Sequence, residues 1–157
     1  MADDSGVWAK IVPTDFNLGG GKVLQVVPSR QSGSVDHAIT QPTATKLRAR
    51  IKPNAPTNRI IVTAFTTVLA DNQATDAYLY LYKNSLPPDA DAVQLGKYMH
   101  VNSLNTLNAI QTIVDTFVAN TTDEFEVILA ASASTGSMTT GYGAGTNQVM
   151  ILMEVAE

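Results

Sequence analysis

The clearest structural signal in the sequence is Asn147-Gln148-Val149-Met150-Ile151-Leu152-Met153-Glu154-Val155-Ala156-Glu157. From Val149 to Val155 every side chain is apolar except that of Glu154. A strand with one face in water alternates apolar and polar residues, whereas a run that is apolar at both parities is typical of a strand covered on both faces. A helix also fits the periodicity, but the run is short and follows the Gly-rich segment 136–145. We therefore predict a central β-strand that the fold, or a subunit interface, covers.

Length and composition narrow the class of protein. A chain of 157 residues suggests one domain, and it has no cysteine for disulfides, thiolate nucleophiles or Cys-ligated zinc. Charged residues make up 15%, well under the ~25% of ordinary soluble domains, so the surface is polar but easily desolvated and suits subunit contacts. A net charge of −4 argues against nucleic acid as a partner. The acidic start indicates no signal peptide, and no apolar run reaches the ~20 residues that cross a membrane.

The first 20 residues differ from the rest of the chain. Pro13 and the glycines at 19–21 interrupt any periodicity, while Trp8 and Phe16 are among a few scattered apolar side chains. We predict an N-terminal arm over residues 1–20 and a β-sandwich domain over residues 21–157. The arm either docks on a partner or neighbouring subunit, with Trp8 as an anchor, or packs on its own domain. The sequence leaves both interpretations open.

From residue 22 onward, short strand-like segments alternate with turn residues, and no convincing amphipathic helix occurs. Segment 86–101 is ambiguous. Segment 132–146 is predicted to be a long exposed loop in which Met138 and Tyr142 are the only bulky side chains. The predicted strands are 22–27, which Pro28 ends, and 35–40, 46–52, 60–69, 77–83, 110–118, 124–131 and 149–155. This pattern predicts an all-β fold, most simply a jelly-roll-type antiparallel β-sandwich.

Segment 46–52 presents a row of cations. Its apolar residues alternate with Lys46, Arg48, Arg50 and Lys52, so that the four cations share one face of the strand. This face suits an acidic protein partner such as a capsid shell or a neighbouring subunit. It equally suits a solvated face, or an edge strand that charge protects from aggregation. Aromatic residues do not interleave with the cations, which argues against nucleic acid.

The aromatic and titratable residues offer little chemistry. Tyr78, Tyr80 and Tyr82 share one strand face and form either a sugar-stacking platform or, more simply, a packed face. Asp36 precedes His37 directly, and neighbouring residues of a strand point to opposite faces, so Asp36 does not orient His37 for hydrolysis. Asp89 and Asp91 lack the other residues of a calcium loop. We predict no catalytic residues, no metal site and no cofactor.

Four segments of the sequence form a recognisable set: Lys22–Val27, Ile51–Val62, Leu107–Phe117 and Gly143–Ala156. They resemble segments of a group of bacteriophage virion domains, cyanophage proteins among them, that occur in fibre and decoration proteins. The resemblance covers most of residues 21–157 and excludes the arm. It implies a homotrimeric β-sandwich of the virus particle, located at its outer surface, without catalysis.

Two functions follow as hypotheses from this resemblance. The first is a trimeric decoration or cement protein that binds the major capsid protein, or another virion protein, and stabilises the phage head. The second is a receptor-binding module at the tip of a tail or head fibre, which binds a host surface receptor. The absence of a shaft ahead of the sandwich favours the first. The expected trimer interface is Val149, Ile151 and Met153, and the expected capsid or partner contact is Trp8, Phe16, Lys46, Arg48, Arg50 and Lys52.

Overall fold

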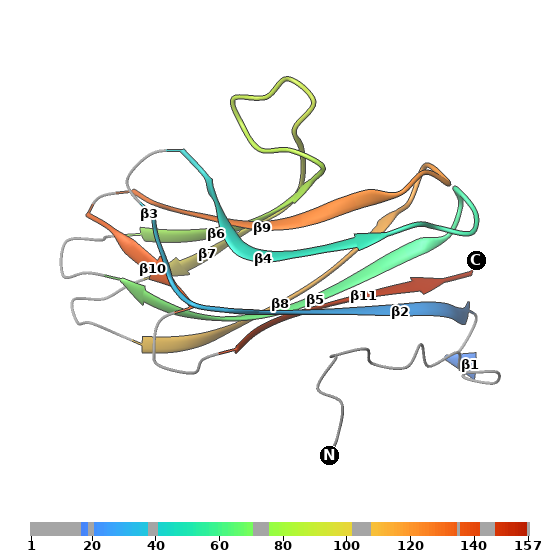
Figure 1. Cartoon of the computed structure of the whole chain (residues 1–157), viewed down its shortest axis with the longest axis horizontal. Helices are drawn as coiled ribbons and strands as arrows, with labels where there is room; N and C mark the ends of the chain where they lie inside the picture. Colours follow the sequence, from blue (N-terminus) through green and yellow to red (C-terminus); the bar gives the residue numbers. More distant parts are fainter. Residues whose placement is uncertain are drawn as a thin grey trace, which may run out of the picture.

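The computed structural model shows two β-sheets that face each other (Figure 1). It describes residues 17–18, 21–37, 41–70, 76–101, 108–134, 136–141 and 147–156. The strands are β1 (Asn17–Leu18), β2 (Gly21–Ser32), β3 (Val35–His37), β4 (Thr43–Ile51), β5 (Arg59–Ala70), β6 (Asp76–Lys83), β7 (Val93–Val101), β8 (Asn108–Val118), β9 (Phe125–Ala133), β10 (Met138–Thr140) and β11 (Asn147–Val155).

The order of the strands identifies a jelly roll. One sheet runs β2-β11-β5-β8, and the facing sheet runs β4-β9-β6-β7, with all pairs antiparallel. Counted along the chain, these eight long strands change sheet at every step except from β6 to β7, which is the order that the two Greek keys of a jelly roll require. The short strands β1, β3 and β10 extend the first sheet. The predicted all-β, antiparallel sandwich is therefore confirmed.

The prediction of a central strand at the end of the sequence is also confirmed. β11 lies between β2 and β5 and pairs with both along most of its length. Its side chains divide by parity: Met150 and Leu152 face the other sheet and are fully buried. Val149, Ile151 and Met153 face outward and are half-buried. Within one chain, then, only the inner face of β11 is fully covered, and cover of the outer face by a subunit interface stays a prediction.

The core lies between the two sheets, which is why apolar and polar side chains alternate along the strands. β4 contributes Leu47 and Ile51, both almost fully buried, as the alternation of segment 46–52 predicted. Phe117 and Phe125 pack against each other with ring centroids 5.9 Å apart, which joins the end of β8 to the start of β9. The largest buried apolar side chains are Leu47, Ile51, Ile60, Val62, Leu81, Leu129, Met138, Met150 and Leu152.

Pro28 does not end the first strand, contrary to the prediction. β2 continues through it to Ser32, with Pro28 opposite Ile151 of β11. β1 pairs only with Gly21 and Lys22, so that at Pro28 the strand has no partner strand on its other side among the described residues. A proline lacks an N–H group but is tolerated where that group would face the edge of a sheet.

Met138 is not exposed, contrary to the prediction. It opens β10, which pairs with β5 on one side and β3 on the other, and its side chain is 1% exposed. The predicted loop 132–146 therefore contains a sheet strand that fills the end of the core. Its three residues were too few to produce a readable pattern. The ambiguous segment 86–101 contains β7, and Tyr142 lies outside the described residues.

Candidate interaction surfaces

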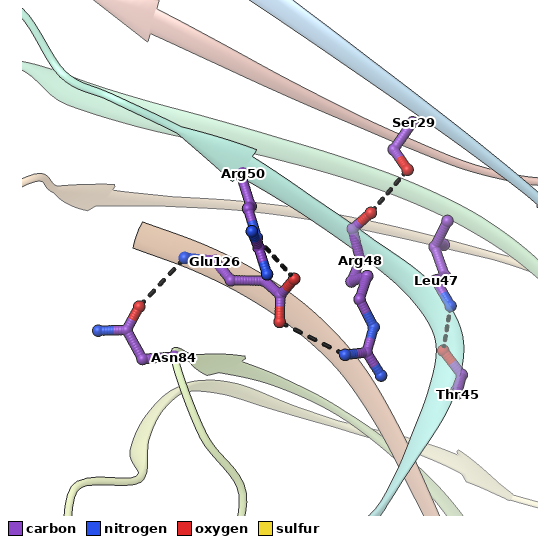
Figure 2. Close-up of polar contacts among 7 residues, drawn as sticks. All are labelled: Ser29, Thr45, Leu47, Arg48, Arg50, Asn84 and Glu126. Carbon is purple, nitrogen blue, oxygen red and sulfur yellow. Dashed lines mark hydrogen bonds and ion pairs between the residues drawn. The ribbon is translucent and has the colours of Figure 1, made fainter. Parts of the chain in front are cut away.

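The predicted row of cations begins on β4, an outer strand of its sheet, and ends at Lys52 directly after it; all four side chains are exposed. Figure 2 shows two of them, Arg48 and Arg50. Arg50 Nε lies 3.2 Å and Arg48 Nη1 3.5 Å from the carboxylate of Glu126 on the neighbouring strand β9. Two of the four cations therefore share one anion, and the row keeps a positive balance. Such exposed ion pairs contribute little to stability. The position of β4 at a sheet edge agrees with one interpretation, whereas protection from aggregation and contact with an acidic partner both stay predictions.

Glu126 is a residue that sequence analysis missed. It lies on the outward row of β9 and is held by the turn after β6 (Figure 2): its main-chain N donates to Asn84 Oδ1 at 3.1 Å, and its carbonyl accepts from Asn84 N at 2.8 Å. Asn84 has a φ of 66°, a conformation that asparagine adopts more readily than most residues. The alternation of β9 placed Glu126 outward, but only the pairing of β9 with β4 brings it to Arg48 and Arg50.

The main-chain edge of β4 is closed by side chains of the opposite sheet. Ser29 Oγ donates to the carbonyl of Arg48 at 2.6 Å, and Gln25 Nε2 donates to the carbonyl of Lys52 at 2.7 Å. These contacts satisfy acceptors that an outer strand would otherwise present to another chain. Around Arg48 and Lys52, the main-chain carbonyls are therefore already used within the sandwich.

The second surface is the outward face of the sheet β2-β11-β5-β8, which we call the β11 face. It carries the predicted trimer residues Val149, Ile151 and Met153, and beside them Phe65 of β5 and Val114 of β8, which are 36% and 62% exposed. Neither β2 nor β5 contains an acidic residue, and Glu154 of β11 points inward. Arg30 and Arg59 pair with Val149 and Val155 and so belong to this face as well. The described part of the face is thus largely apolar and carries no negative charge, as is typical of surfaces that other protein covers.

Glu154 is the most unusual polar residue of the sandwich. It is fully buried, yet four donors reach its carboxylate: Asn54 N and Nδ2, both at 2.7 Å, Asn58 Nδ2 at 2.5 Å, and Gln25 Nε2 at 2.6 Å. Burial raises the pKa of Glu154, but these hydrogen bonds outweigh it and leave the pKa below the usual value. The carboxylate joins the turn between β4 and β5 to β2 and β11.

His37 is buried as well, at the opposite end of the sandwich. Its Nδ1 lies 2.6 Å from Thr43 Oγ1 and its Nε2 2.8 Å from Thr140 Oγ1. Burial lowers the pKa of His37 to about 4, although the nearby Asp36 carboxylate acts in the opposite sense. Asp36 itself points to solvent and accepts a hydrogen bond from Thr139 at 2.6 Å. The prediction that Asp36 does not orient His37 is confirmed.

The tyrosine row is a packed face, as the simpler interpretation predicted. Tyr80 and Tyr82 are 7% and 4% exposed, and Leu86 and Ala92, from the segment between β6 and β7, pack against them. Lys97 Nζ lies 4.2 Å from the ring centroid of Tyr78, so that the lysine covers the end of the tyrosine row. The rings of Tyr80 and Tyr82 are therefore not available as a platform for sugar stacking.

Among the described residues, no three or more His, Cys, Asp or Glu side chains form a group that could hold a metal ion. In that same part of the chain we find no helix with the length and apolar character needed to span a membrane. Trp8 and Phe16, the predicted partner contacts of the arm, lie outside the described residues. The end of the predicted arm is described: Asn17 and Leu18 pair with Lys22 and Gly21.

Comparison with known proteins gives a distant structural likeness. No protein-family model matches the sequence, and no curated protein matches it. Among solved structures, the chain is similar to one in the structure of infectious bursal disease virus, Gx strain, with a TM-score of 0.35 and 14% sequence identity. The match covers 90% of this chain and 41% of that chain. A likeness at this level carries no functional argument.

Proposed function

We propose that this chain is a structural protein of a bacteriophage particle, a trimeric decoration or cement protein that binds the outside of the head. The observation that supports it best is the β11 face. It is a largely apolar sheet surface without negative charge, on a sandwich that has a core of its own. Its sequence resemblance to phage virion domains supplies the setting. A trimer presents three copies of each weak contact to the head, so that its binding gains from avidity.

In this proposal the two surfaces have different roles. The β11 face joins copies of the chain through Val149, Ile151 and Met153. The cations of β4 remain exposed and meet an acidic partner, the major capsid protein. Lys46 and Lys52 carry this contact because Glu126 already neutralises part of the charge of Arg48 and Arg50. Bound trimers bridge neighbouring capsid subunits and stabilise the shell by mass action.

Replacing Ile151 with Asp is expected to prevent trimer formation. Ile151 is half-buried on the outward row of β11, between Pro28 of β2 and Thr63 of β5. A carboxylate there would be desolvated without a partner in every three-fold contact. Light scattering on the purified protein measures the change, with circular dichroism as the check on folding. Thr122→Asp, at an exposed position of the turn between β8 and β9, is the matched control. A folded Ile151→Asp variant that remains a trimer would place the interface elsewhere.

Decorated phage particles are expected to rupture at a higher temperature than particles that lack the protein. The measurement is a thermal genome-release assay, combined with a count of copies per particle by mass spectrometry. Lys46→Glu together with Lys52→Glu should lower occupancy, most strongly at low salt because salt screens exposed charges. Lys22→Glu, at an exposed cation of β2, is the control. Equal rupture temperatures with a loss of adsorption to host cells would instead support a receptor-binding module.

A further inference from the structure

The free edge of β8 is unlike the other edges of the two sheets. β8 pairs with β5 over Asn108–Val118 without an irregularity, and no described strand lies on its other side. The other outer strands carry features that discourage pairing. β4 has its four cations and a register shift, β7 has a register shift beside Gly96, and β2 contains Pro28. A long regular edge without such features favours addition of another strand.

The exposed residues of β8 form an uncharged row, which consists of Ile110, Thr112, Val114, Thr116 and Val118. Ile110 is 75% and Val114 62% exposed. The N–H group of Thr116 donates to Asp115 Oδ1 at 2.7 Å and is therefore not used by β5. Because alternate residues of a strand direct their main-chain groups to opposite sides, all five residues of the row turn theirs toward the free edge.

This row is nearly palindromic about Val114. Thr112 and Thr116 flank it at equal distances, and Ile110 and Val118 follow. In an antiparallel pair related by a two-fold axis at Val114, threonine meets threonine and isoleucine meets valine, which are favourable cross-strand pairs. Each residue of the row exchanges two main-chain hydrogen bonds with its opposite, about ten in all, which is the number typical of a stable interface.

We propose that β8 is a site at which a second copy of this chain binds, by antiparallel β8–β8 pairing centred on Val114. The sheet β2-β11-β5-β8 then continues into the same sheet of the second copy. The row contains no charged side chain, so no like charges face each other across the axis. A second copy of the same chain supplies, by symmetry, a row of matching length and spacing. The contact uses the sheet edge, not Val149, Ile151 and Met153, and does not rest on the proposed function.

Asp115 is the only charged residue of β8, and its position is compatible with this pairing. Its side chain lies on the inner side of the strand, where Tyr98 Oη donates to its Oδ2 at 2.6 Å. On pairing, the N–H of Thr116 exchanges Asp115 Oδ1 for the carbonyl of Thr112 in the second copy. Asp115 retains Tyr98, so the carboxylate is not left without a donor.

Disulfide trapping tests the pairing directly, because the chain contains no cysteine of its own. Opposite residues of this kind lie ~5.5 Å apart at Cα, within the ~4.4–6.8 Å range of disulfides. Mild oxidation of Val114→Cys should give a covalent dimer on a non-reducing gel. Val93→Cys, at an equally apolar position that is 52% exposed on β7, is the matched control. A dimer yield no higher than that of the control would overturn the proposal.

The register is tested by mixing two single variants. Ile110→Cys and Val118→Cys should cross-link to each other, whereas Ile110→Cys alone should not, because its two copies would lie ~27 Å apart at ~3.4 Å per residue. Cross-linking of Ile110→Cys with itself would reject the register centred on Val114.

The oligomeric state separates this contact from the three-fold contact. Val114→Lys should halve the mass measured by light scattering, and Val93→Lys should leave it unchanged. If the three-fold contact also exists, the wild-type protein is a hexamer and the Val114→Lys variant a trimer. If it does not, the wild-type protein is a dimer and the variant a monomer. A mass unchanged by Val114→Lys contradicts β8 pairing in either case.

Discussion

Replacement of Glu154 by Gln is expected to lower the free energy of unfolding by roughly 1–3 kcal/mol. The amide keeps one oxygen for Asn54 N and Asn58 Nδ2, but its NH₂ group would face Gln25 Nε2 and Asn54 Nδ2, which are donors. The loss of the acceptor costs most at the half-buried Gln25, because water can reach the exposed Asn54. Rotation of the Gln25 amide does not repair this, since its Nε2 also donates to the carbonyl of Lys52.

Urea unfolding of the purified protein measures the effect of Glu154→Gln. The matched control is Glu124→Gln, which removes the same charge at an exposed position and should change stability by less than about 0.5 kcal/mol. A loss for Glu154→Gln no larger than for the control would mean that the cluster at Glu154 contributes nothing net. The expected loss would also loosen the turn between β4 and β5, which hydrogen exchange at Asn54 and Asn58 would detect.

Acidification from pH 6.5 to about 4 is expected to destabilise the protein through His37 by roughly 3 kcal/mol. The pKa of His37 is lowered from 6.5 to about 4, so that across this interval the unfolded chain binds a proton that the folded chain does not. Stability is therefore complete above pH 6.5 and decreases as pH falls toward 4. Glu154, whose pKa is also lowered, adds its own loss only below about pH 4.5, the usual value for a glutamate.

The free energy of unfolding, measured by urea at steps between pH 7 and 4.5, isolates the contribution of His37. His37→Gln removes the titrating group and should flatten the pH dependence, at a lower stability at pH 7 because the hydrogen bonds to Thr43 and Thr140 change. His100→Gln removes the other histidine and serves as the control. A His37→Gln variant with the same slope as the wild-type protein would show that another group causes the acid sensitivity.

Much of the sandwich follows from local sequence patterns. The alternation of Leu47, Ala49 and Ile51 with four cations predicted both the strand β4 and its exposed charges, because side chains of a strand alternate between two faces. The apolar run at Val149–Val155 predicted a central strand. In each case the information lies within a single strand, where the period of two is a property of the backbone.

The patterns failed where a residue's environment comes from elsewhere in the chain. The sequence predicts a strand end at Pro28, yet this residue lies at an open sheet edge where a missing N–H costs nothing. It predicts a loop at Met138, because the three residues of β10 form a strand only by pairing with β5 and β3. The palindromic row of β8 was present in the sequence, but it acquires meaning only once β8 is known to be an outer strand.

Glu154 shows most clearly where the division lies. The sequence determined that it sits in an apolar central strand, where a charge has no evident reason to be. Its donors come from positions 25, 54 and 58, about 100 residues or more before it. A periodic pattern describes how one strand divides its side chains between two faces, whereas neighbours across a jelly roll depend on the path of the whole chain. Only the tertiary structure therefore supplied the hydrogen bonds that make a buried carboxylate stable there.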